Sequence, residues 1–375
     1  MVGATAPRVS ATVILPKPLL QQVLDNLRQA GFQLIGPTVR DGAVVLSEIK
    51  NISDLPVGWA LQQKPGSSRL KKTHATDYFA CTVGPHSWKQ YLYPPRFDFL
   101  YAHRKNGGWV FEPPKDDSPP FAFVGVRSCD LHAIAMQDEV FVSGTIREPH
   151  YAHRRERAFI LAVNCNNAAS TCFCTSMKTG PRARSGFDLA VTELPESFVL
   201  EIGSEAGSGA LDKVDWQPAS AFDQGRVTQI IQRTEQQIQK QINISELPQI
   251  LYERIDHPYW DEIATHCLSC ANCSLVCPTC FCSTVEDRID LSGRNTKRTR
   301  VWDSCFILDF SHVHGGNIRP TIKARYRQWM THKFGAWIDQ FGRPGCVGCG
   351  RCIAWCPVGI DITEELSTLC SLGAR

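Results

Sequence analysis

The chain has 375 residues, enough for two to three domains, and its 43% hydrophobic residues suffice for sizeable cores. A net charge of +3 gives no reason to expect nucleic acid or an acidic membrane surface as a partner. The longest apolar runs are of strand length, far below the roughly 20 residues of a membrane helix, and the N-terminus lacks a secretory h-region of the usual length. We therefore expect a cytoplasmic protein with no integral membrane segment and no nucleic-acid partner.

The first 45 residues are predicted to form a strand, a helix and a strand. Residues 18–30 are amphipathic, with Leu19, Leu20, Val23 and Leu27 on one stripe. Residues 32–35 and 43–49 are predicted strands, whereas residues 50–120 are rich in loops.

The middle of the chain is more regular. Residues 121–126 and 158–164 are typical of buried strands, and a helix that Ser128 or Asp130 can cap runs between them to about residue 141. This order predicts a right-handed crossover and a parallel pair of strands, and residues 187–202 are predicted to form a hairpin. We therefore expect an N-terminal α/β (α+β) domain, residues 1–250, with a partly parallel sheet.

A polar helix at residues 226–242 either links the two halves or packs on the N-terminal domain. From about residue 255 the composition shifts to cysteine, tryptophan and basic residues. We predict a second domain at residues 251–375, ferredoxin-like and rich in α-helix, with a helical insertion at residues 278–345.

Cysteine is the unusual residue, with 17 copies, and two runs share one spacing. Residues 267–278 and 346–357 both read C-x2-C-x2-C-x3-C-P, the bacterial ferredoxin pattern for cubane iron–sulfur clusters. Structural zinc is the alternative, but its cysteine pairs are usually separated by longer loops. The sequence therefore predicts two [4Fe–4S] clusters, and a reducing compartment, since clusters bind thiolates rather than disulfides.

In two-cluster ferredoxins, the fourth cysteine of each run binds the other cluster. Carried onto this chain, the first cysteine set is Cys267, Cys270, Cys273 and Cys356. The second cysteine set is Cys346, Cys349, Cys352 and Cys277. Gly348 and Gly350 are expected to let the backbone approach the cluster closely, where its amides can donate to sulfur.

A third cysteine set, Cys129, Cys165, Cys172 and Cys174, lies in the N-terminal half. Cys129 and Cys165 directly follow the two predicted parallel strands, so both should emerge at the sheet edge where α/β folds bind ligands. The loop at residues 165–174 can fold back to complete a third [4Fe–4S] site. Two alternatives remain: Cys129 and Cys165 are buried apolar cysteines, or Cys280, Cys282 and Cys305 contribute ligands to a site at the domain interface.

Several motifs together resemble the beta subunits of soluble multi-subunit [NiFe] hydrogenases (sulfhydrogenases) and the A subunits of anaerobic sulfite reductases. They are residues 125–131 (GVRSCDL), 164–165 (NC), 171–177 (TCFCTSM), 179–181 (TGP), 267–282, 302–305 (WDSC), 332–334 (HKF) and 346–357. The resemblance implies an electron-transfer subunit between a flavin subunit that handles NAD(P)H and a catalytic subunit, which carries nickel–iron in one family and sirohaem in the other.

The function expected from this resemblance is electron transfer without substrate chemistry, with a [NiFe] hydrogenase favoured over a sulfite reductase as the catalytic partner. No dinucleotide-binding, P-loop or hydrolase motif is present in the sequence. The alternative is a stand-alone reductase that acts on a disulfide or sulfur substrate, motivated by the remaining thiols Cys280, Cys282 and Cys305.

Overall fold

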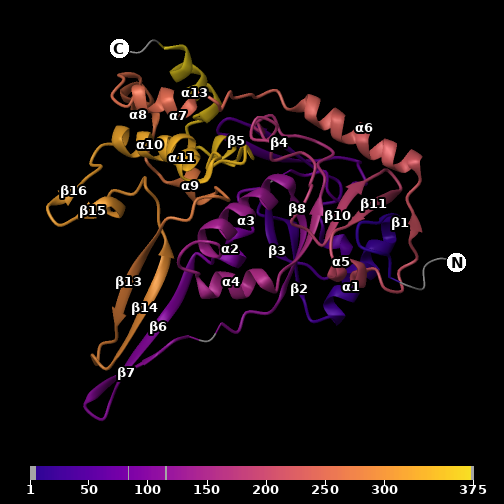
Figure 1. Ribbon diagram of the computed structural model, residues 1–375, viewed down its shortest axis with the longest axis horizontal. Coiled ribbons are helices and arrows are strands. Elements are labelled where there is room, and N and C mark those ends of the chain that lie inside the picture. Colours follow the sequence, from indigo (N-terminus) through magenta and orange to yellow (C-terminus); the bar gives the residue numbers. More distant parts are fainter. Residues whose placement is uncertain (1–5, 83, 115, 373–375) are drawn as a thin grey trace.

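The N-terminal half is built around an eight-stranded mixed sheet (Figure 1), in a computed structural model that describes residues 6–82, 84–114 and 116–372. In spatial order its strands are β12 (Gln217–Pro218), β1 (Thr12–Pro16), β11 (Ser197–Ile202), β10 (Leu189–Glu193), β9 (Phe159–Val163), β8 (Phe121–Arg127), β2 (Gln33–Arg40) and β3 (Ala43–Glu48). The four central strands β10, β9, β8 and β2 are parallel, and the outer pairs are antiparallel. The predicted parallel pair and the predicted hairpin β10–β11 are thus confirmed.

Alternate residues of the central strands supply two separate hydrophobic cores, one on each face of the sheet. Leu161 and Val163 of β9 pack in the core that holds helix α1 (Leu20–Gln29). Ile160 and Ala162 of the same strand pack in the core that holds α3 (Ser128–Phe141) and α4 (Pro149–Glu156). Because both faces are covered, the strand is apolar throughout, as buried parallel strands are.

The start of α3 differs from the prediction. Ser128 is its first residue, and Arg127, at the N-cap position, makes no capping hydrogen bond. The Ser128 hydroxyl donates to the carbonyl of Arg182 at 2.8 Å, and Asp130 binds Arg351. Both polar side chains of the first turn are therefore used in tertiary contacts rather than as caps.

Helix α6 (Ala221–Gln237) begins earlier than predicted and serves both suggested roles. Ser220 caps it through a capping box with Asp223, and Val227 and Ile231 pack on the N-terminal sheet. Its end leads along the top of the sheet toward the C-terminal half (Figure 1).

The C-terminal half contains short helices, most of which pack around one hydrophobic core. They are α7 (Leu247–Glu253), α8 (Tyr259–His266), α9 (Asn272–Leu275), α10 (Ile322–Thr331), the π-helical segment η4 (His332–Ala336), α11 (Trp337–Phe341), α12 (Arg351–Ala354) and α13 (Ile362–Ser371). Among the described residues, no helix is long and apolar enough to cross a membrane.

The insertion at residues 278–345 is not entirely helical, so the expectation of an all-helical excursion there is not confirmed. Its first part forms the hairpin β13 (Ser283–Ile289) and β14 (Asn295–Trp302). Strand β14 pairs with β6 (Arg96–Lys105), which pairs with β7 (Gly108–Glu112), in a four-stranded sheet that projects from the body as an arm (Figure 1). The β-branched residues Thr296, Thr299 and Val301 favour strand over helix here. The predicted boundary near residue 250 stays a prediction, although strand pairing joins segments from both sides of it.

Candidate metal centres

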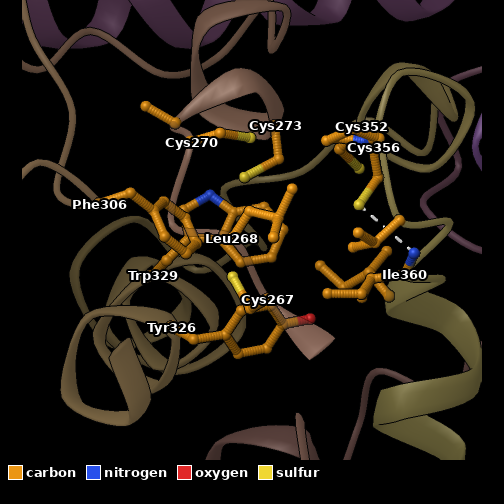
Figure 2. Close-up of a pocket in the computed structure, with 14 residues that line it drawn as sticks. Cys267, Leu268, Cys270, Cys273, Phe306, Tyr326, Trp329, Cys352, Cys356 and Ile360 are labelled. Carbon is orange, nitrogen blue, oxygen red and sulfur yellow. Dashed lines mark hydrogen bonds between the residues drawn. The ribbon is translucent and has the colours of Figure 1, made fainter. Parts of the chain in front are cut away.

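The first cysteine set lines one cavity, whose empty volume including its mouth is about 460 Å³. Cys267, Cys270, Cys273 and Cys356 surround it together with the aromatic rings of Phe306, Tyr326 and Trp329 (Figure 2). Cys267 caps the end of α8, Cys273 lies in α9, and Cys356 follows α12, so the cavity joins both C-x2-C-x2-C-x3-C-P runs.

Left-handed backbone at Ser269 (φ 52°) and Ala271 (φ 65°) shapes the loop of the first run. This turn lets the Ser269 amide donate to Cys267 Sγ at 3.4 Å, and the Ile360 amide donates to Cys356 Sγ at the same distance. Burial raises the pKa of Cys273 well above its usual value. The buried sulfur is therefore costly as a bare thiolate, and a bound iron would supply the positive charge that stabilises it.

The second cysteine set lies at the opposite ends of α9 and α12, because Cys277 follows α9 and Cys349 precedes α12. Burial raises the pKa of Cys352 well above its usual value, and the neighbouring thiols Cys346, Cys349 and Cys277 raise it further. The Gly348 amide donates to Cys346 Sγ at 3.4 Å, as expected for a ligand turn. These four side chains from the two runs are thus close enough to affect one another's charge.

All four residues of the third cysteine set line a second cavity, with an empty volume of about 380 Å³. Cys129 comes from the first turn of α3, Cys165 follows β9, and Cys172 and Cys174 come from the loop that folds back over the sheet edge. The structure therefore brings together the residues that the strand-end argument grouped. Cys349 of the second set lines this cavity too, so the second and third sets are neighbours.

Gly348 and Gly350 join the second and third sets. Both have positive φ, and a Cβ at Gly350 would lie 2.4 Å from the carbonyl oxygen of Thr171. At Gly348 a Cβ would lie 2.6 Å from the carbonyl of Phe173, whose amide donates to the Gly348 oxygen at 2.9 Å. The lack of a side chain at these glycines therefore lets the loop that carries Cys172 and Cys174 approach the second set closely. From the sequence, the same glycines were expected to let the backbone approach a cluster.

The thiols Cys280, Cys282 and Cys305 lie outside the linings of both cavities. Cys280 neighbours Cys277 of the second set, and Cys305 neighbours Cys282 and Cys273 of the first. Cys280 Sγ is 3.7 Å from Lys333 Nζ, and a hydrogen bond from Cys305 lowers the pKa of Cys282 to about 7. Among the described residues, no three His, Cys, Asp or Glu side chains are close enough to hold a single metal ion. In a cubane cluster each thiolate binds its own iron, so its four ligands lie farther apart than those of one ion.

The roles of four charged residues near these sites were not predicted from the sequence. Arg351 forms a buried ion pair with Asp130, and Lys333 and Lys89 contact the segment that carries Cys277 and Cys280. Asp130 lies within the motif GVRSCDL and Lys333 within HKF. Both motifs support the family resemblance, but the resemblance assigned neither residue a role beside the clusters.

Comparison with known proteins agrees with the cysteine geometry. Residues 266–360 match a family model described as a 4Fe-4S dicluster domain, and this range contains the first two cysteine sets. Over 352 residues the chain is 30% identical to the protein named sulfhydrogenase 2 subunit beta from Pyrococcus furiosus, an alignment that covers 92% of this chain and 94% of that protein. No solved structure matches. A match over nearly the whole of both chains extends the relationship beyond the dicluster domain to the N-terminal half. The chain therefore belongs to the family of sulfhydrogenase beta subunits and is an iron–sulfur electron-transfer protein with [4Fe–4S] clusters.

Proposed function

We propose that the chain carries three [4Fe–4S] clusters, held by the three cysteine sets, and relays electrons through them. The observation that carries the proposal is the adjacency of the sets. Cys352 of the second set also lines the cavity of the first, and Cys349 of the second set lines the cavity of the third. The second set therefore lies between the other two, and three clusters in this order form one continuous route.

Each cysteine set fits such a cluster chemically, because it offers four thiols from loops shaped by surrounding elements. When bound, the clusters supply one-electron redox chemistry. The protein's own groups hold them, exclude water with the aromatic wall of the first cavity, and donate amide hydrogens to the sulfurs of Cys267, Cys346 and Cys356.

For the partners, we propose a flavin subunit that handles NAD(P)H at one end of the route and a [NiFe] hydrogenase catalytic subunit at the other. The name of the Pyrococcus furiosus relative supports the hydrogenase assignment. A sirohaem sulfite reductase is the second candidate. Purification of the intact complex without oxygen, followed by assays for nickel, sirohaem and flavin, distinguishes the two.

Iron counting tests the cluster number. Three clusters require about 12 iron atoms per chain, and two require about 8. A double variant, Cys165→Ala with Cys172→Ala, is expected to lose about 4 iron atoms and leave the signals of the other two clusters unchanged. Cys370→Ala is the matched control, because Cys370 is exposed on the last helix and belongs to none of the three sets. A wild-type count near 8 would refute the third cluster.

The thiols Cys280, Cys282 and Cys305 keep the stand-alone reductase as an alternative. The purified chain, supplied with a reduced dye and polysulfide, should show no turnover without its partners. Turnover that disappears in Cys282→Ala would establish the reductase instead.

A further inference from the structure

Two buried lysines lie against the segment Cys277–Cys280, at the end of the first cysteine run. Lys333 Nζ lies 3.4 Å from Cys277 Sγ and 3.7 Å from Cys280 Sγ. Lys89 Nζ donates to the carbonyl oxygens of Cys277 (3.1 Å) and Cys280 (2.8 Å), and lies 3.9 Å above the ring of Trp302. The two side chains are only 6% and 4% exposed, so solvent screens neither ammonium group.

Neither ammonium group is paired with a carboxylate of the described residues: Lys333 faces sulfur, and Lys89 faces backbone carbonyls. Within the described residues, the lysine ion pairs are those of Lys17, Lys240, Lys297 and Lys323. Lys333 Nζ instead has two cysteine sulfurs within 3.7 Å, those of Cys277 and Cys280. A buried cation needs an anionic partner, and here the cysteine ligands provide it.

The backbone around Lys333 is built to hold its side chain inward. Lys333 lies in the π-helical segment η4, an irregularity that is frequent at functional sites. Its ammonium group also donates to the Gly345 carbonyl at 2.7 Å and to the Thr279 hydroxyl at 3.1 Å. The same segment packs closely on α7, since a Cβ at Gly335 would lie 2.9 Å from the Tyr252 hydroxyl. The position of the charge is therefore fixed.

The other cations beside the cysteine sets are arranged differently. Arg351, near Cys349 and Cys129, is neutralised by Asp130 at 2.9 Å. Arg325, near Cys267, reaches Ser269 Oγ at 3.2 Å and two backbone carbonyls rather than a sulfur. Of the three sets, the second thus has two buried ammonium groups against its ligand segment, one of them in contact with a ligand sulfur.

We propose that Lys333 and Lys89 are positioning residues that give the cluster of the second set the highest reduction potential of the three. Reduction adds one electron and thus one negative charge, which a buried cation stabilises, and hydrogen bonds to ligand sulfur act in the same direction. Electrons then collect at the middle of the route before they leave toward a partner. This inference depends on the proposed three-cluster relay.

The test is a redox titration of the intact complex, followed by electron paramagnetic resonance. Lys333→Met is expected to lower the reduced-to-oxidised ratio of the second cluster at least tenfold at a fixed potential, which is about 59 mV for a one-electron couple. Lys323→Met is the matched control, because Lys323 lies on the neighbouring α10 and pairs with the exposed Asp261. It should leave all three potentials unchanged.

Two results would overturn the inference: an unchanged second potential in Lys333→Met, or an equal shift of all three clusters. If Lys333→Met does not assemble the cluster, Lys89→Met, which removes a charge without touching a sulfur, must lower the same potential. An unchanged potential in that variant also overturns it. Fewer than three cluster signals in the wild type would instead refute the relay itself, so the two failures are distinguishable.

Discussion

Arg351 and Asp130 form a two-fold hydrogen-bonded ion pair, with N–O distances of 2.9 and 3.1 Å, between α12 of the C-terminal half and α3 of the N-terminal half. Both side chains are almost fully buried, and Arg351 also donates to the Gly84 carbonyl at 3.1 Å. Arg351 lies between Cys349 and Cys352 in sequence, while Asp130 follows Cys129. The pair therefore fixes the second cysteine set against the third.

Asp130→Asn leaves the Arg351 guanidinium buried without its counter-charge, and such losses cost about 3–5 kcal/mol. We expect that decrease in the free energy of unfolding in urea, measured on anaerobically purified protein. Glu139→Gln is the matched control: it breaks a half-exposed pair with Arg343 between the same helix α3 and the C-terminal half. It should cost about 1 kcal/mol or less, and an equal loss in both variants would contradict the role assigned to Asp130.

Gly350→Ala should separate the loops that carry the second and third sets. The new methyl group meets the Thr171 carbonyl, in addition to the strain of positive φ. Gly342→Ala has nearly the same φ but nothing within 4 Å, so it isolates the strain of about 1–2 kcal/mol. Thermal unfolding should show a clearly larger loss for Gly350→Ala, together with loss of iron. Similar melting temperatures would mean that the loops can move apart freely.

Crossed ligation predicts which cysteine variants behave alike. Cys356→Ala should remove the same electron paramagnetic resonance signal as Cys270→Ala, because Cys356 and Cys270 both line the first cavity. Cys277→Ala should instead match Cys346→Ala. Spectra of the four variants, each with its iron content, provide the measurement. If Cys356→Ala matched Cys346→Ala, each run would bind its own cluster and the crossed assignment would be wrong.

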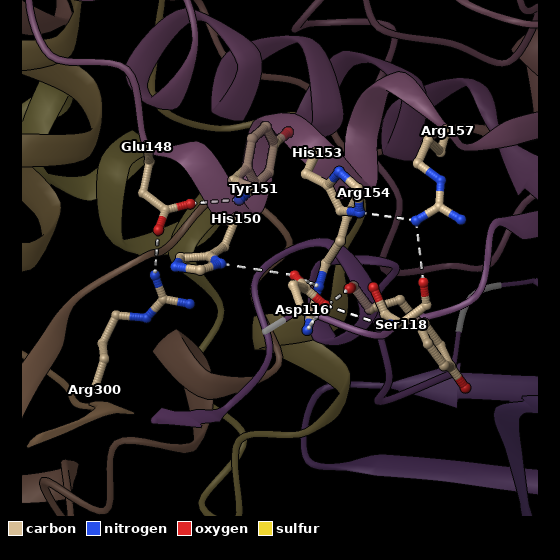
Figure 3. Close-up of polar contacts among 10 residues, drawn as sticks. Asp116, Ser118, Glu148, His150, Tyr151, His153, Arg154, Arg157 and Arg300 are labelled. Carbon is tan, nitrogen blue, oxygen red and sulfur yellow. Dashed lines mark hydrogen bonds and ion pairs between the residues drawn. The ribbon is translucent and has the colours of Figure 1, made fainter. Parts of the chain in front are cut away.

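Asp116 is expected to make the fold sensitive to acid. Burial acts to raise the pKa of Asp116, but hydrogen bonds from Arg154, at 2.8 and 3.1 Å, and from the Ser118 amide outweigh it and lower the pKa to about 2 (Figure 3). An unfolded Asp titrates near 3.9, so the folded state binds this proton more weakly. Its stabilisation is present above about pH 4 and is lost as the pH falls toward 2.

The difference in unfolding free energy between the wild type and Asp116→Asn measures this effect and cancels the acid sensitivity that both share. It should be of the order of 2 kcal/mol above pH 4 and shrink toward pH 2. A difference that stays constant over this range would show that Asp116 contributes through packing alone.

The features that could be predicted from the sequence are those that short-range sequence patterns determine. Apolar runs gave the parallel strands β8 and β9, and their ends placed Cys129 and Cys165 at one sheet edge, where one cavity now holds both. The two cluster-binding runs could be recognised from the sequence because the geometry of a cubane cluster fixes the spacing of its cysteine ligands. These features depend on residues that are close in sequence or on topology that follows fixed rules of handedness.

The features that were missed depend on contacts between distant segments. No local sequence signal predicts that β6 pairs with β14. The register of a polar strand is only weakly specified by its own sequence, so the pairing depends on the fold that brings these two strands together. Lys89 and Lys333 were equally unpredictable, because long charged side chains are normally solvated. Their burial against the Cys277–Cys280 segment distinguishes them from the other lysines that the structure describes.

The four-stranded arm has a consequence for synthesis of the chain. Thr299 of β14 donates to Asp98 of β6 across a separation of 201 residues. At about 5–20 residues per second, the ribosome needs roughly 10–40 s to deliver β14 after β6 has emerged. During that interval the β6–β7 hairpin presents an unpaired edge, to which β14 of another copy can add. Slow translation or crowded expression should therefore favour strand-swapped chains.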